Sequence, residues 1–135
     1  MNYKIIDIEG IGEAFASKLM AENIDTVEQL LDRCAAPAGR KELAEKTGIS
    51  EKLILRWTNH ADLFRVDGIG PQFAELLEAA GVDTVKELRH RVPANLASKL
   101  VEVNEEKHLC RRVPVESELQ RMIDQAKELE PRMTY

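Results

Sequence analysis

The chain has 135 residues, of which 32% are charged and 4% aromatic, and its net charge is −5. This composition is that of an ordinary globular protein and excludes a disordered or fibrous chain. Apolar runs are only a few residues long and the first ten residues lack the basic region and apolar stretch of a secretory signal, so we expect no membrane span and a cytoplasmic location.

The main feature of the sequence is an internal repeat with a shift of 58 residues. Residues 8–34, IEGIGEAFASKLMAENIDTVEQLLDRC, align without a gap to residues 66–92, VDGIGPQFAELLEAAGVDTVKELRHRV, and twelve positions are identical. Chance does not produce such a match, so the repeat sets the fold.

Each copy predicts the same run of elements: a helix, a tight glycine turn, a helix, a short turn and a further helix. Apolar residues at helical spacing follow each Gly-Ile-Gly. Gly81, and Asn23 in the first copy, predict left-handed helix ends. Thr26 and Thr84 are each followed three residues later by Gln or Glu, which predicts a capping box at the next helix. No segment alternates with period two, so we expect no sheet.

A helical arm follows each copy. In the first arm, residues 37–48 predict a helix, and Ser50 predicts the cap of the next one. In the second arm, Pro93 opens a helix, Asn104 is predicted to cap another, and residues 116–129 carry an amphipathic stripe.

These elements predict an all-α protein of three segments. The first unit with its arm spans residues 1–64, the second spans 65–130, and a frayed tail spans 131–135. Because no linker separates the copies, we expect the two units to pack as one compact helical body, with Trp57 in its core.

The stretches IEGIG and VDGIG resemble the hairpin of helix-hairpin-helix proteins, in which a Gly-apolar-Gly turn leads into the second helix. Nearly the whole chain, through GRKELAEKTGIS, RWTNHADLFRVDGIG and the closing RRVP and AKEL segments, resembles a family of small bacterial proteins classed as a domain of unknown function and related to helix-hairpin-helix modules. The resemblance implies two tandem helix-hairpin-helix units and no specific activity.

A glycine turn of this kind can hold a phosphate. Glycine adopts positive φ and lets a ligand approach closely, and the first amides of the following helix have no internal partner and lie at its positive end. We therefore expect non-specific contact with DNA or RNA phosphates; the alternative is a turn that serves the packing of the helices alone. The candidate hairpin residues are Gly10, Gly12, Gly68 and Gly70.

Charge is divided along the repeat. Residues 5–32 hold one base and seven acids, and residues 66–85 hold no base and four acids. Bases follow in the arms: six against three acids over 33–56, and seven against four over 86–112. The arms are either phosphate-tracking stripes, or they pair with the acidic hairpins, within the chain or between copies, in a protein-interaction or oligomerisation module. The candidate phosphate-binding bases are Lys41, Arg56, Arg91, Arg111 and Arg112.

The segment 42–57 also matches the spacing of a helix-turn-helix, with Gly48 in the turn. In a DNA-reading role, this motif would direct Ser50, Glu51, Lys52 and Arg56 to the groove.

No enzyme is predicted. His60, His90 and His108 are scattered and lie in no nucleophile pattern, and the phosphate-loop and dinucleotide fingerprints are absent from the sequence. Cys34 and Cys110 form no C-x-x-C pair, so no metal or redox site is predicted. We expect no catalytic residues, no cofactor and no small-molecule substrate.

Overall fold

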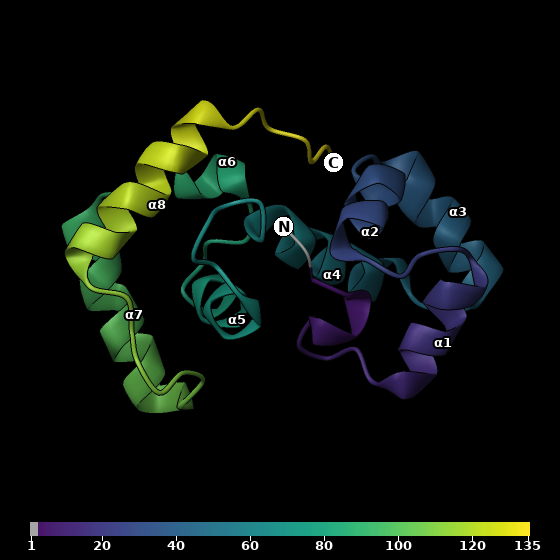
Figure 1. Ribbon diagram of the computed structural model, residues 1–135, viewed down its shortest axis with the longest axis horizontal. Helices are drawn as coiled ribbons and strands as arrows, with labels where there is room; N and C mark the ends of the chain where they lie inside the picture. Colours follow the sequence, from purple (N-terminus) through teal and green to yellow (C-terminus); the bar gives the residue numbers. More distant parts are fainter. Residues whose placement is uncertain (1–2) are drawn as a thin grey trace. The chain divides into compact units, whose positions relative to one another are not determined.

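The computed structural model describes residues 3–135, in which helices are joined by loops and no strand occurs (Figure 1). The expected all-α class is therefore confirmed. Within these residues, no helix is long and apolar enough to cross a membrane. The elements are the 3-10 helix η1 (Ile5–Asp7) and the helices α1 (Glu13–Ala21), α2 (Val27–Cys34), α3 (Pro37–Thr47), α4 (Glu51–Leu63), α5 (Pro71–Ala79), α6 (Val85–Leu88), α7 (Pro93–Lys107) and α8 (Glu116–Glu128).

Contacts divide the chain into two compact units, each with its own core. The first comprises the residues up to Asp62 together with Arg132–Tyr135, and the second comprises Leu63–Pro131. Large apolar side chains of the first core are Leu19, Ile24, Leu30, Leu43, Ile54 and Trp57, and those of the second are Leu77, Val82, Leu88, Leu100, Leu119 and Ile123.

The sequence repeat is reproduced in the backbone of the two glycine turns. Gly10 and Gly68 have φ of 95° and 92°. In both turns the amide of the following isoleucine donates to the carbonyl three residues before it, at 3.1 and 3.2 Å. Gly12 and Gly70 then N-cap α1 and α5 with extended backbone. The same residues at the same spacing therefore build the same turn twice.

The segment before the first turn differs from the expected helix. It is the single turn η1, because Lys4 is held extended by an antiparallel bridge to Thr26 and its amide donates to the Asp7 carboxylate at 2.9 Å. The second turn follows the full helix α4 in the chain.

Threonine begins the third helix of each copy, as predicted. The Thr26 hydroxyl accepts from the Gln29 amide at 3.1 Å, and the Gln29 side chain accepts from the Thr26 amide at 3.0 Å, which completes the capping box. The Thr84 hydroxyl likewise accepts from the Glu87 amide at 3.2 Å. The Glu87 carboxylate instead accepts from Arg91 at 3.0 Å, because this ion pair competes for the same oxygens.

The other predicted helix ends are confirmed where glycine or a short polar side chain marks them. Asn23 and Gly81 are left-handed, with φ of 65° and 93°, and Gly48 ends α3 with φ of 73°. The Ser50 hydroxyl accepts from the Leu53 amide at 3.2 Å at the start of α4.

Asn104 does not cap a new helix, so that prediction is wrong. α7 continues past it to Lys107 and ends at the left-handed His108. The Asn104 side chain accepts from the Cys110 amide at 2.9 Å and donates to the Cys110 carbonyl at 2.8 Å. The Asn104 side chain therefore fixes the loop that follows α7, while its backbone stays within the helix.

The frayed tail expected over 131–135 is corrected for its last four residues. Arg132 forms an ion pair with Asp32 at 2.7 Å, and Met133 is 7% exposed. The Thr134 amide donates at 2.9 Å to the carbonyl that follows α2. Burial of one methionine and these bonds order a segment that has no helical periodicity.

Candidate nucleic-acid interface

The two glycines of the first turn have different surroundings. Gly10 lies against the buried Trp57, and a Cβ built on it would be 3.7 Å from the indole Nε1. The ring of Phe15 meets the same indole edge-on, with 5.0 Å between centroids. Gly12 is exposed, has φ of −89°, and a Cβ built on it would have nothing within 4 Å. Gly10 thus serves the turn, whereas Gly12 leaves an open approach to α1.

The second turn is braced by α8. A Cβ on Gly68 would lie 3.2 Å from the Cε of Met122. The amide of Asp67 donates to the side chain of Gln125 at 2.9 Å. The turn therefore has a fixed position within its unit, which leaves Gly70 half-buried at the start of α5.

Both helices that follow the turns begin with unpaired donors. No side chain caps α1 or α5, since Gly12 and Gly70 occupy the cap positions. Among the described residues, the amides of Gly12, Glu13 and Ala14 find no acceptor, and neither do those of Gly70 and Gln72. In contrast, threonine hydroxyls cap α2 and α6. The amides at α1 and α5 are placed to bind an anion.

Arg91 and its repeat equivalent Arg33 are tied to the fold. Arg91 donates to the Gly81 carbonyl at 3.1 Å and pairs with Glu87. Arg33 donates to the Glu22 carbonyl at 2.8 Å and to its carboxylate at 3.1 Å. Each guanidinium closes the loop after the helix that follows the glycine turn, α1 for Arg33 and α5 for Arg91. The sequence did not reveal this role for Arg91, although the identity of positions 33 and 91 was a signal for it.

The loop between α7 and α8 brings one predicted base, Arg112, to the start of α5, and a second, Arg111, precedes it in the chain. The Arg112 guanidinium lies over the ring of Phe73, 5.7 Å from its centroid. The Cys110 thiol donates to the Gln72 carbonyl at 3.3 Å, which holds the loop against the first turn of α5. Arg111 is exposed and forms no ion pair within residues 3–135. The second unit therefore gathers an uncapped helix start and Arg112, with Arg111 next to it in the chain.

Arg112 shares its charge with Glu118. Both of its terminal nitrogens donate to the carboxylate oxygens. This hydrogen-bonded pair lowers the pKa of Glu118 and raises the pKa of Arg112. An anion that approaches α5 therefore meets a guanidinium whose charge is already partly balanced.

The bases of the first arm are not gathered in this way. Lys41 is exposed on α3, and in the described part of the chain no hydrogen bond or ion pair joins it to the first turn. Arg56 is half-buried on α4. The residues nearest the turn in sequence are the acids Glu9 and Glu13. The first turn thus offers amides with no base placed beside them.

Side chains for metal chemistry are not clustered: no group of three or more His, Cys, Asp or Glu in the described residues is placed to hold an ion. Cys34 is fully buried, and burial raises the pKa of its thiol to about 11.

Fold and surface together define an all-helical protein of two units, in which a repeated Gly-Ile-Gly turn opens a helix with uncapped amides. The chain belongs to the family described as "Domain of unknown function (DUF4332)", whose model matches residues 9–129. Comparison with curated proteins and with solved structures gave no match. The family description carries no activity, so the function has to be argued from the surface.

Proposed function

We propose that this protein is a non-enzymatic member of the helix-hairpin-helix class that contacts nucleic-acid phosphates without reading the bases. The observation that carries the proposal is the glycine start of α1 and α5. The helices α3, α7 and α8 also lack a side-chain cap, but they begin at Ala36, Val92 and Val115, whose side chains narrow the approach to the amides. Two helices are capped by threonine, whereas the two that follow the repeated turns begin with Gly12 and Gly70 and leave their amides unpaired. Such amides, at the positive end of a helix, favour a phosphate oxygen.

Support is greatest at the second turn. There the amides of Gly70 and Gln72 lie near Arg112, and Arg111 is its exposed neighbour in the chain. A phosphate held by the amides would also attract the guanidinium groups, and such charge-assisted hydrogen bonds are stronger than neutral ones. At the first turn, we propose that Gly12 contributes amides alone, with Lys41 and Arg56 as secondary contacts from the arm. Arg91 is left out of this set because its guanidinium closes a loop of its own unit.

The acidic residues limit the affinity for nucleic acid that we expect. A net charge of −5 opposes a polyanion, and Glu9 and Glu13 flank the first turn. Non-specific binding typically has a Kd of about 10⁻⁴–10⁻⁶ M at physiological salt, and we expect this protein at the weak end of that range. Its affinity should fall as salt rises, and the slope of log K against log salt should be modest, at about −0.9 for each phosphate contact, because only a few contacts carry the binding.

The test is fluorescence anisotropy of a labelled duplex of about 20 base pairs, titrated at about 50 and 200 mM salt. The decisive variant is Gly12→Thr with Gly70→Thr. Threonine accepts the extended backbone of a cap position, and its hydroxyl would satisfy the amides that the phosphate needs. We expect at least a fivefold loss of affinity with the fold intact, while Ser17→Thr on the exposed face of α1 leaves binding unchanged. Absence of binding by the unaltered protein at the lower salt would refute the proposal.

A second candidate is a self-association module, favoured by an apolar surface on the first unit. Ile6 is 47% exposed and Met20 is 53% exposed. They line a groove of about 200 Å³ with Lys4, Ile5, Ala16 and Asp25. Exposed apolar side chains around a groove are typical of protein contacts. If a second copy docks here, light scattering will show a mass that rises with concentration, and Met20→Glu will return the protein to a monomer.

A further inference from the structure

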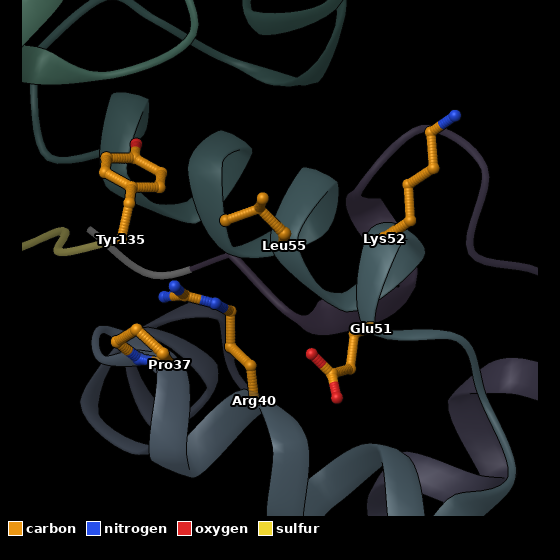
Figure 2. Close-up of a pocket in the computed structure, with 6 residues that line it drawn as sticks. All are labelled: Pro37, Arg40, Glu51, Lys52, Leu55 and Tyr135. Atoms are coloured by element: carbon orange, nitrogen blue, oxygen red, sulfur yellow. The ribbon is translucent and has the colours of Figure 1, made fainter.

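A pocket on the first unit has no part in the proposed phosphate contact. Its volume is about 330 Å³, and it lies between the starts of α3 and α4 beside the end of the chain (Figure 2). The lining residues are Pro37, Arg40, Glu51, Lys52, Leu55 and Tyr135.

Arg40 is the unusual member of this lining, because it is only 5% exposed. Its Nη1 donates to the carbonyls of Cys34 and Ala35 at 2.9 and 3.1 Å, and its Nη2 donates to the Thr134 carbonyl at 2.7 Å. A guanidinium has five N–H groups. These bonds leave the Nε–H and one Nη2–H without an acceptor in the part of the chain that the structure describes.

No carboxylate within residues 3–135 forms an ion pair with Arg40. A buried charge is costly unless it is paired, and here the carbonyls of Cys34, Ala35 and Thr134 and the ring of Tyr135 face it, with no carboxylate of the described residues in an ion pair. The unpaired cation and its two unused donors therefore point to an anionic ligand in the adjoining space.

The other residues that line the pocket indicate the shape and polarity of the rest of that ligand. The Tyr135 ring lies over the Arg40 guanidinium, with 5.7 Å between the Cζ and the ring centroid, and its hydroxyl donates to the Asn59 side chain at 3.2 Å. Leu55 and the ring of Pro37 add apolar surface. Figure 2 shows Glu51 reaching toward Arg40 from α4, while the Lys52 ammonium points away.

We infer that this pocket binds a small monocarboxylate with a flat apolar body. A carboxylate has two coplanar oxygens that match neighbouring guanidinium donors, and the body would pack on Leu55, Pro37 and the tyrosine ring. The lining side chains include two bases, Arg40 and Lys52, and one acid, Glu51. A phosphate dianion would be repelled by Glu51. The volume lies at the lower end of the range for ligand pockets, about 300–1,000 Å³.

The experiment uses the full chain and three probes: benzoate, its neutral isostere benzamide, and acetate, which lacks the ring. Amide chemical shifts in nitrogen-15 spectra report the site. For a ligand of this size, we expect benzoate to saturate with a Kd of roughly 1 mM. Benzamide and acetate should each bind at least tenfold more weakly. Benzoate should perturb Arg40, Leu55 and Tyr135, and slow hydrogen exchange of the Thr134 amide, because binding stabilises the state that holds it.

Variants test the placement. Glu51→Gln removes the opposing charge and should tighten benzoate binding two- to fivefold, while Tyr135→Ala removes a wall and should weaken it at least fivefold. Glu45→Gln, on an exposed part of α3 outside the lining, is the matched control and should leave the Kd unchanged. Arg40→Gln should abolish binding, but Arg40 also holds backbone carbonyls, so the Glu51 and Tyr135 variants are decisive if it unfolds. Three results would each overturn the inference. The first is equal binding of benzoate and benzamide. The second is a failure of benzoate to saturate the site at about 20 times the expected Kd. The third is that both the Glu51 and the Tyr135 variants keep the affinity of the unaltered protein.

Discussion

Gly10 packs directly against the indole nitrogen of Trp57, which is buried and has no hydrogen-bond partner in the described residues. This contact joins the first glycine turn to α4. It also separates the roles of two glycines that look equivalent in sequence. Gly10 has positive φ and a neighbour on its Cβ side, whereas Gly12 has neither. Gly12 is therefore open to a ligand, and a substitution there should not damage the fold.

The first prediction compares serine at these two positions. Gly10→Ser should lower the free energy of unfolding by about 1–2 kcal/mol, because an L-residue is strained at positive φ. Gly12→Ser should leave it unchanged or raise it by a few tenths, since serine is a favoured N-cap. Urea unfolding followed by Trp57 fluorescence measures both. Equal losses at the two positions would contradict the roles assigned to them.

The turns and caps were predictable because they depend on local chemistry. Positive φ requires glycine or a residue such as Asn23, and a threonine three residues before Gln29 can reach its amide. The repeat supplied each signal twice. The limit of such reasoning is seen at Asn104, where a cap-forming residue lies inside a helix because its side chain bonds to a later loop.

The roles of the arginines and of the last residues were not predictable in this way. A base looks the same in sequence whether it faces solvent or, like Arg91, closes a loop. Arg40 and Thr134 are bonded across 94 positions, and Arg132 and Asp32 across 100. An extended segment that returns to a distant helix leaves no periodic pattern in the sequence. The pocket beside Arg40 could therefore be found only in the structure.

The second prediction separates structural from surface arginines. Arg91→Gln should lower the free energy of unfolding by about 1 kcal/mol, because it removes hydrogen bonds to Gly81 and Glu87. Arg111→Gln should have no effect on stability. Binding to the duplex should show the reverse pattern. Arg111→Gln should reduce the slope of log K against log salt by about 0.9, the value for one phosphate contact. Arg91→Gln should leave this slope unchanged. A weaker salt dependence in Arg91→Gln would return that residue to the proposed interface.

The third prediction concerns the acid that balances Arg112. Glu118→Gln should raise affinity for the duplex about two- to fivefold and steepen its salt dependence, because the guanidinium beside α5 is then available to a phosphate. Glu106→Gln, an exposed acid on α7, makes the same change in net charge and is the control. If both variants tighten binding equally, only net charge matters and Arg112 has no special place in the contact.

The fourth prediction is a pH dependence that arises at Cys34. Burial raises the pKa of its thiol from 9.0 to about 11, so the folded state keeps the proton at a pH where the unfolded chain has lost it. The folded state then binds more protons than the unfolded state, and the stability must fall as pH rises between these values. Two pKa units correspond to roughly 2–3 kcal/mol.

Urea unfolding at pH 8 and 10.5 measures this effect, as the difference between the unaltered protein and Cys34→Ala, in which the dependence should be absent. The comparison cancels the titration of lysine and tyrosine, and Cys110→Ala is the matched control that should keep the full dependence. In the native protein at pH 8, a thiol reagent should modify the half-buried Cys110 much faster than Cys34, because the thiolate is the reactive form and Cys34 is both buried and protonated. Equal rates at the two cysteines would show that α2 opens readily. The burial of Cys34, on which the predicted pH dependence rests, would then be contradicted.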